Sequence, residues 1–163
     1  MLNYKPKIIH KFVNPLAKKK GLNYKTKGAG AVDLFTMEDV HINAKHGTIV
    51  GVGVAFAIEQ DWAGILLPRS GAGNYLKQSD VSIELANTIG LIDSDYRKEV
   101  LMNLKLKPHV HNMYGSLHIP AGTRICQMGF VYMPQANLEE WGEDTELPKT
   151  ERGSGCCNST GMN

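Results

Sequence analysis

The stretch Val100–Lys107, which reads VLMNLKLK, decides the fold class because its side chains alternate in character. Every second position is apolar, and this series consists of Val100, Met102, Leu104 and Leu106. The series between them holds Leu101, Asn103, Lys105 and Lys107. Alternation with a period of two predicts a β-strand that buries one face.

Other short segments rich in apolar and β-branched residues follow along the chain, separated by turn residues. They are Lys7–Val13, Gly47–Ile58, Ala63–Leu67, Val81–Leu85 and Thr123–Met133. Strands this short and evenly spaced are typical of sandwiches, jelly rolls and barrels. Short helices are expected only over Gly73–Ser79 and around Leu138–Trp141. The sequence thus predicts one all-β domain with at most one or two short helices.

The composition excludes several classes of protein. Eighteen basic and sixteen acidic residues nearly balance in a chain of 163, so we expect no nucleic acid and no membrane as a partner. No apolar stretch approaches the roughly 20 residues of a membrane-spanning helix. We interpret the run Lys18–Lys20 as a solvated loop. Three cysteines, two of them adjacent, do not make a disulfide framework, and a reducing cytoplasm fits them best.

The end of the chain differs in kind from the rest. From Arg152 onward the sequence reads RGSGCCNSTGMN, which is almost entirely small and polar. Such a segment has little apolar area to bury, so residues 152–163 are predicted to form a mobile arm beside a domain of residues 1–151. An arginine followed by spaced glycines and hydroxyls also suits an arm that covers a phosphate group.

Two segments combine charged side chains with turn residues. Pro68–Gly73 (PRSGAG) offers a guanidinium, a hydroxyl and bare backbone amides, which together make an anion site. Gly90–Arg97 (GLIDSDYR) places two carboxylates, a tyrosine and an arginine directly after an apolar hairpin. Taken alone, this acidic segment is interpreted as a loop.

Two further segments insert one polar residue among apolar ones. Arg124–Gln127 (RICQ) carries a glutamine in a strand otherwise suited to burial, and Ala31–Leu34 (AVDL) carries one carboxylate. Other features favour plain structural interpretations: close strand packing for Gly51 and Gly53, and a packed thiol for Cys126. The pair His109 and His111 has no carboxylate or cysteine cluster beside it and is interpreted as a solvated loop rather than a metal site.

In this order and spacing, these segments and the tail resemble the five motifs of the trimeric dUTPase family, from Gly30 to Gly161. The resemblance implies a jelly-roll-like (β-clip) fold with a flexible C-terminal arm. It also implies a homotrimer whose three active sites lie where subunits meet, with each arm closing over a neighbouring site. The implied activity is the hydrolysis of dUTP to dUMP and pyrophosphate, which limits uracil incorporation into DNA and supplies dUMP.

The resemblance implies a role for each matching residue. Asp93 orients and deprotonates the water that attacks the α-phosphorus in line, and Tyr96 packs beneath the deoxyribose, so we expect both to share a cavity with residues 69–71. Asn87 reads the uracil edge, and the backbone near Leu91 and Ile92 supplies further base contacts. The phosphates are held by Arg69, Ser70, Gly71, Gln127 and Arg152, with Gly153, Ser159 and Thr160 of the arm. Mg²⁺ is held mainly by the phosphates and water, with Asp33 contacting it indirectly through water.

The resemblance is incomplete at the arm, where Cys156, Cys157 and Asn158 replace a Gly-Phe-Gly stretch that covers the uracil. We expect weaker substrate binding or a less firmly closed arm, because stacking on an aromatic contributes about 1–3 kcal/mol per base in other systems. Two alternatives stay open: a hydrolase of a modified deoxyuridine nucleotide, and a weakly active family member that serves as a regulatory binding protein. The related dCTP deaminases need a glutamate in the strand after the acidic segment, and residues 100–106 contain none. The expected location is the cytoplasm, or the host cytoplasm if the chain is viral or from a phage.

Overall fold

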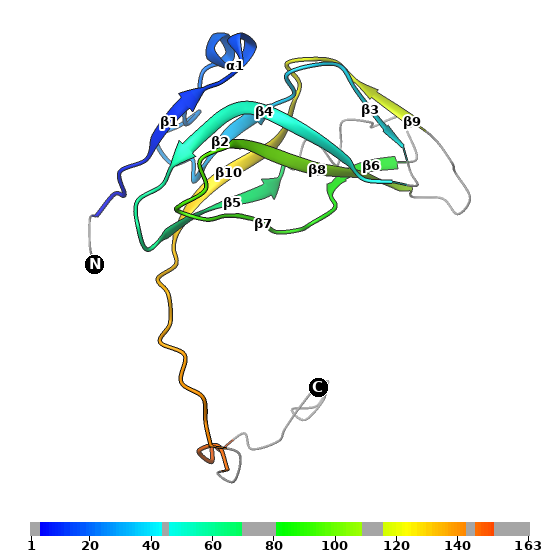
Figure 1. Ribbon diagram of the computed structural model, residues 1–163. Helices are drawn as coiled ribbons and strands as arrows, with labels where there is room; N and C mark the ends of the chain where they lie inside the picture. Colours follow the sequence, from blue (N-terminus) through cyan, green and yellow to red (C-terminus); the bar gives the residue numbers. More distant parts are fainter. Residues whose placement is uncertain (1–3, 44–45, 70–80, 109–115, 143–145, 152–163) are drawn as a thin grey trace.

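Figure 1 shows a computed structural model of the protein, which describes residues 4–43, 46–69, 81–108, 116–142 and 146–151. Within these ranges the chain forms ten strands and one short helix. In chain order the elements are β1 (Ile9–Phe12), α1 (Pro15–Lys20), β2 (Ala31–Phe35), β3 (Val40–Asn43), β4 (Thr48–Ala57), β5 (Trp62–Pro68), β6 (Val81–Leu85), β7 (Gly90–Ile92), β8 (Glu99–Pro108), β9 (Ser116–Ile119) and β10 (Arg124–Tyr132). The helix expected over Gly73–Ser79 lies outside the described residues.

The strands form two four-stranded sheets and one two-stranded sheet, and every pair is antiparallel. The first sheet has the order β1-β4-β8-β6, the second has the order β2-β10-β5-β7, and β3 pairs with β9. Figure 1 shows the first sheet lying over the second. The apolar hairpin expected before Asp93 is not formed. Strands β6 and β7 belong to different sheets, and the turn between them crosses from one layer to the other. The two layers confirm the predicted all-β, jelly-roll-like class.

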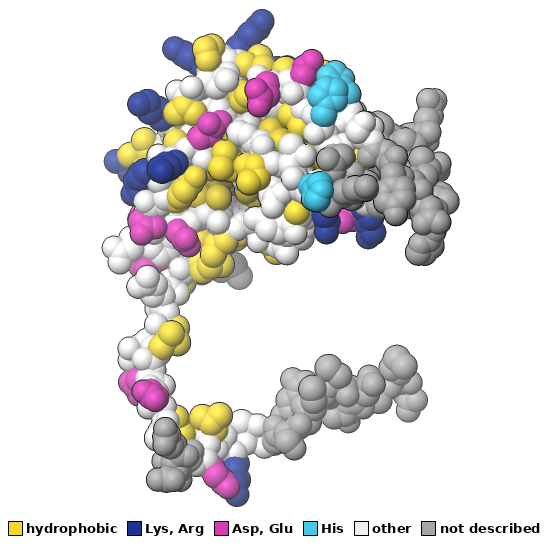
Figure 2. All heavy atoms as spheres, turned by 45° about the vertical axis from the view of Figure 1, so that its right-hand side comes forward, with side chains coloured by type: hydrophobic (Ala, Val, Ile, Leu, Met, Phe, Trp, Pro, Cys, Tyr) yellow, Lys and Arg dark blue, Asp and Glu magenta, His cyan; other side chains and the backbone are white. Residues whose placement is uncertain are grey.

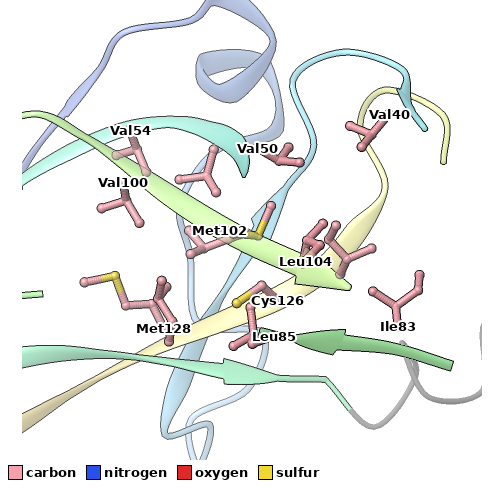
Figure 3. Close-up of a cluster of buried hydrophobic side chains, with 14 of the residues drawn as sticks. Val40, Val50, Val54, Ile83, Leu85, Val100, Met102, Leu104, Cys126 and Met128 are labelled. Carbon is pink, nitrogen blue, oxygen red and sulfur yellow. The ribbon is translucent and has the colours of Figure 1, made fainter. Parts of the chain in front are cut away.

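The hydrophobic core lies between the layers, and β8 supplies its centre. Met102 is 0% exposed, whereas its neighbour Leu101 is 46% exposed, so the alternation predicted from the sequence is confirmed. Figure 3 shows the side chain of Met102 across the core from Cys126 and Met128 of β10. Full burial of a side chain of this size contributes roughly 1.5–3 kcal/mol.

Cys126 is a packed thiol, as the sequence predicts. Its side chain is fully buried, and its Sγ donates a hydrogen bond to the carbonyl oxygen of Leu67 at 3.2 Å. Desolvation in the core raises the pKa of this thiol to about 12. The thiol therefore stays protonated at neutral pH and is no nucleophile.

Helix α1 corrects the interpretation of Lys18–Lys20 as a loop. The side chain of Asn14 accepts a hydrogen bond from the backbone N–H of Leu16, and Pro15 opens the helix. Asparagine at the cap and proline at the first helical position are strong start signals. The three lysines lie exposed in the last turn, where cations interact favourably with the helix dipole. No helix in the described ranges is long and apolar enough to cross a membrane.

The segment after β10 leaves the sheets as an extended strap, residues 133–142 and 146–151 (Figure 1). The short helix expected around Leu138–Trp141 is not formed. Leu138 is 90% exposed and Leu147 is 73% exposed, so no part of the described chain packs against these side chains. An isolated helix shorter than about 12 residues is marginal in water, which accounts for the absence of a helix here.

A β-bulge in β4 explains why glycines stand at positions 51 and 53. It also involves Glu99, a glutamate at the start of β8. The register of β4 against β8 shifts between Gly51 and Ala55, and Gly53 has φ of +70°. The Gly53 amide donates to Glu99 Oε1 at 2.7 Å, and a Cβ at Gly51 would collide with this carboxylate. Strand β8 begins at Glu99, so the strand after the acidic segment does contain a glutamate. Its carboxylate is bound to the bulge and has a structural role.

Met102 and Leu101 lie on opposite faces of β8, so their truncation is expected to change the free energy of unfolding by unequal amounts. Met102→Ala is expected to lower the free energy of unfolding by about 2–5 kcal/mol, because it opens a cavity in the core. Leu101→Ala removes a half-exposed side chain of similar size and is the matched control. Urea unfolding at one fixed protein concentration measures both. Equal losses for the two variants would contradict the assigned faces of β8.

Candidate active site

A buried carboxylate bound by two arginines lies on β2, an edge strand of the second sheet. Asp33 of β2 is 8% exposed. Its Oδ1 lies 2.9 Å from Nε of Arg69, and its Oδ2 lies 3.3 Å from Nη1 of Arg124. An ionised carboxylate removed from water requires such partners. We call Asp33, Arg69 and Arg124 the arginine–carboxylate cluster.

Strand register brings the cluster together from three distant parts of the sequence. Asp33 is the cross-strand partner of Gln127 on β10, and Gln127 faces Leu67 of β5 on its other side. The side-chain amide of Gln127 donates to the carbonyl oxygen of Pro68 at 3.1 Å. The sequence-predicted residues Asp33, Arg69 and Gln127 therefore lie on adjacent strands, close to where β5 ends.

Arg124 joins this group and was not predicted as a site residue. Nη1 of Arg69 also donates to the carbonyl oxygen of Arg124 at 3.3 Å, so the two arginines are held together. The signal in the sequence was the position of Arg124 at the head of the RICQ segment, but its approach to Asp33 depends on the register shift between Arg124 and Cys126. Two guanidinium groups against one carboxylate leave a net positive charge, which favours binding of an anion such as a phosphate.

The acidic segment forms a second group, at the other end of β5. Strand β7 pairs with β5, so that Ile92 faces Gly64 and Gly90 faces Leu66. Asp93 follows β7 directly, is exposed, and lines a cavity of about 630 Å³ together with Ile58 and residues 60–63. The backbone N–H of Tyr96 donates to the carbonyl oxygen of Asp93 at 3.2 Å and closes a turn. The Tyr96 hydroxyl donates to the carbonyl oxygen of Glu99 at 2.9 Å, which fixes the ring.

Asp93 and the arginine–carboxylate cluster do not share a cavity within one chain. Asp93 lies beside the first residues of β5, whereas Arg69 follows the last residue of that strand. Six residues of extended strand separate the two levels by roughly 20 Å. The cavity lined by Asp93 includes neither Arg69 nor Tyr96. The expected shared cavity is therefore absent from the described part of a single chain, and Ser70 and Gly71 lie outside that part.

The base-reading residues of the sequence analysis lie together on an exposed turn and edge strand. Asn87 is exposed in the turn before β7, and Leu91 is 50% exposed. Ile92 is half-buried. In the described sheet β7 is an edge strand, and the outer edge of such a strand presents backbone N–H and C=O groups that a planar base can pair with.

The arm residues Arg152, Gly153, Ser159 and Thr160 lie outside the described residues. Among the residues that the structure describes, no three His, Cys, Asp or Glu side chains are grouped to hold a metal ion. Both oxygens of Asp33 already accept from arginines. These contacts fit an indirect, water-mediated contact of Asp33 with a metal better than direct ligation.

The fold and these two groups define a class: a two-layer antiparallel β protein with an anion-binding arginine pair and a separate acidic turn. A family model described as dUTPase matches residues 17–161. The chain belongs to the dUTPase family.

Several curated relatives carry the name deoxyuridine 5'-triphosphate nucleotidohydrolase. The relative from Dictyoglomus turgidum is 33% identical over 147 residues, which cover 86% of this chain and 89% of the relative. The relative from Finegoldia magna is 33% identical over 159 residues, covering 96% of this chain and 99% of the relative. These matches span both the cluster and the acidic segment.

Solved structures of the same fold include the dUTPase of Staphylococcus bacteriophage 80alpha with dUPNHPP, with a TM-score of 0.74 and 21% identity over 96% of this chain and 99% of that chain. A mutant dUTPase from phage phi11 of S. aureus, described with a structural Mg(II) ion, has a TM-score of 0.66 and 19% identity over 85% of this chain and 98% of that chain. At these identities the likeness establishes the fold.

Because Asp33 binds both arginines, we predict that it positions them. Asp33→Asn removes the charge that they share and is expected to lower the free energy of unfolding by about 1–3 kcal/mol. Glu38→Gln neutralises an exposed carboxylate five positions later and is the control. Chemical unfolding of both variants at neutral pH measures the difference. A loss no larger than that of Glu38→Gln would show that the cluster does not stabilise the fold.

Proposed function

We propose that this chain hydrolyses dUTP to dUMP and pyrophosphate, limiting uracil incorporation into DNA and supplying dUMP. The observation that carries the proposal is the dUTPase match over residues 17–161, which includes Asp93 and the arginine–carboxylate cluster. The proposed place of action is the cytoplasm, or the host cytoplasm for a viral or phage chain.

The proposed reaction is attack of a water molecule on the α-phosphorus, in line with the leaving pyrophosphate. Asp93 accepts the proton of this water as a general base. Arg69 and Arg124 bind phosphate oxygens and stabilise the charge that develops on them. Gln127, on the strand beside Asp33, is proposed to donate to the α-phosphate after it releases its bond to Pro68.

The substrate is held at its base and sugar by the acidic segment. The uracil edge pairs with Asn87 and with the β7 backbone near Leu91 and Ile92, and a cytosine presents the opposite donor and acceptor pattern there. Tyr96 lies beneath the deoxyribose and leaves no room for a 2′-hydroxyl. Its ring is suited to this role because the bond from its hydroxyl to Glu99 fixes its position.

Mg²⁺ is the proposed cofactor, and it neutralises phosphate charge when bound. Most of its ligands would come from the triphosphate and water. Asp33 contacts this hydrated ion indirectly while it continues to hold the two arginines. Ser70 and Gly71 complete the phosphate cradle, and Arg152, Gly153, Ser159 and Thr160 of the arm close it.

We propose a homotrimer with shared active sites. Two observations support an assembly: the separation of Asp93 from Arg69 along β5, and the exposed apolar side chains of the strap that follows β10. A site that needs Asp93 of one copy and Arg69 of another accounts for the first. The strap leads into the arm, residues 152–163, which on this proposal reaches a neighbouring copy.

Asp93→Asn tests the chemistry. Loss of the general base is expected to lower kcat by about 10²–10⁴-fold, with little change in dUTP binding. Pyrophosphate release is measured for dUTP, dCTP, dTTP and UTP, each with and without Mg²⁺, in the wild-type protein and in Asp93→Asn. Asp95→Asn removes the neighbouring exposed carboxylate of the same segment and is the matched control. Near-normal turnover by Asp93→Asn would remove this residue from the mechanism.

The same panel separates the alternatives. Release of pyrophosphate from dUTP alone supports the proposal. Preference for a 5-substituted deoxyuridine triphosphate added to the panel would favour a hydrolase of a modified nucleotide. Binding of dUTP without release from any nucleotide would favour a regulatory binding protein.

Mixing two inactive variants tests the shared site. Asp93→Asn and Arg69→Gln are each expected to be inactive alone. In trimers assembled from equal amounts of both after joint unfolding and refolding, each role falls to an intact copy half of the time. About one quarter of the wild-type activity should therefore return if the two residues come from different copies. A site built within one chain would give no recovery.

A further inference from the structure

The two-stranded sheet of β3 and β9 carries two histidines that face each other. His41 and His118 are direct cross-strand partners. Both are exposed, whereas the flanking Val40 and Ile42 are buried. Figure 2 turns this side of the molecule forward and shows histidine side chains at the surface with acidic side chains near them. The pair lies outside both groups described for the active site.

The separation of the two rings matches that of two imidazoles bound to one ion. The ring centroids of His41 and His118 are 4.8 Å apart. With metal–nitrogen bonds of about 2.0–2.1 Å, each centroid lies about 3.2 Å from the ion, and angles of about 90–110° place the two centroids about 4.5–5.2 Å apart. The observed separation of 4.8 Å falls inside this interval.

A carboxylate already sets the orientation of one ring. Nε2 of His118 lies 3.2 Å from Oδ2 of Asp39, and Oδ1 of Asp39 accepts from the backbone N–H of Ala121 at 2.8 Å. Because a carboxylate only accepts, Nε2 of His118 donates to Asp39, and the neutral ring then keeps Nδ1 as the nitrogen that can bind a metal ion. Histidines that bind metals commonly donate their second N–H to a carboxylate in this way.

We propose that His41 and His118 chelate one divalent transition-metal ion of the Zn²⁺, Ni²⁺ and Cu²⁺ class, with Asp39 holding His118 from outside the ligand set. Water completes the coordination. Imidazole nitrogen suits these ions, whereas Mg²⁺ prefers oxygen. The site is therefore distinct in chemistry and position from the Mg²⁺ proposed at the triphosphate, and binding would fasten β3 to β9.

Titration of the untagged full-length protein with Zn²⁺, Ni²⁺ or Cu²⁺ in isothermal calorimetry tests the site. We expect one ion per chain and at least about a 10-fold loss of affinity for His41→Gln and for His118→Gln. Asp39→Asn should weaken binding by about 10–100-fold while leaving the stoichiometry unchanged. The Cu²⁺ form should show coupling to two nitrogens in electron paramagnetic resonance, and these couplings should disappear in the double variant. Circular dichroism verifies that the variants are folded.

Two controls distinguish this pair from three of the four other histidines. His10→Gln changes an exposed histidine on β1 and should leave binding intact. His109→Gln combined with His111→Gln removes the other closely spaced pair in the sequence. Absence of binding to the wild-type protein would overturn the proposal. So would wild-type affinity in the His41→Gln/His118→Gln protein, or loss of binding only in the His109→Gln/His111→Gln protein.

Discussion

Strand β5 acts as a fixed spacer, and the arrangement of the site depends on it. One edge of β5 pairs with β10 and the other with β7, so both flanking segments are held in register along its length. The acidic segment is tied to its beginning and the arginine–carboxylate cluster to its end. A hydrogen-bonded strand cannot shorten, and a fold built on it keeps the two groups roughly 20 Å apart. The single chain therefore keeps the acidic segment and the arginine–carboxylate cluster apart as two separate groups.

On the proposed function, the arginine–carboxylate cluster must bring two arginines close enough to bind phosphate and must also offset their mutual repulsion. Two guanidinium groups repel each other and lose water when they are brought close enough to bind one polyanion. Asp33 offsets this repulsion, since its two oxygens each bind one arginine. The carboxylate takes only part of the donor capacity of two guanidinium forks, so the remaining N–H groups can address phosphate oxygens without breaking the cluster. On the proposed function, Asp33 thus holds the arginines ready for substrate without occupying all their donors.

The sequence predicted the strands that obey a simple period and missed the features that depend on tertiary pairing. Strand β8 alternates cleanly because one of its faces meets the core, and Val81–Leu85 was predicted with its observed bounds. Helix α1 was hidden because its lysines suggested a loop, although Asn14 and Pro15 carried its start signal. Strands β3 and β9 are short and gain their order from each other. The contact between Arg124 and Asp33 could not be predicted from the sequence. It depends on how β10 pairs with β2, including the register shift beside Arg124.

Because β7 is an edge strand, the proposed recognition of the base by β7 is separate from the proposed covering of the base by the arm. Its outer backbone and Asn87 present donors and acceptors in a fixed pattern, and this pattern discriminates by leaving groups of a wrong base unpaired. Stacking by an aromatic ring is indifferent to base identity, since every base has a π-face. On the proposed binding mode, Cys156, Cys157 and Asn158 in place of a ring-bearing stretch lower affinity and leave selectivity with the edge strand. We therefore expect this chain to distinguish uracil from cytosine without an aromatic cover.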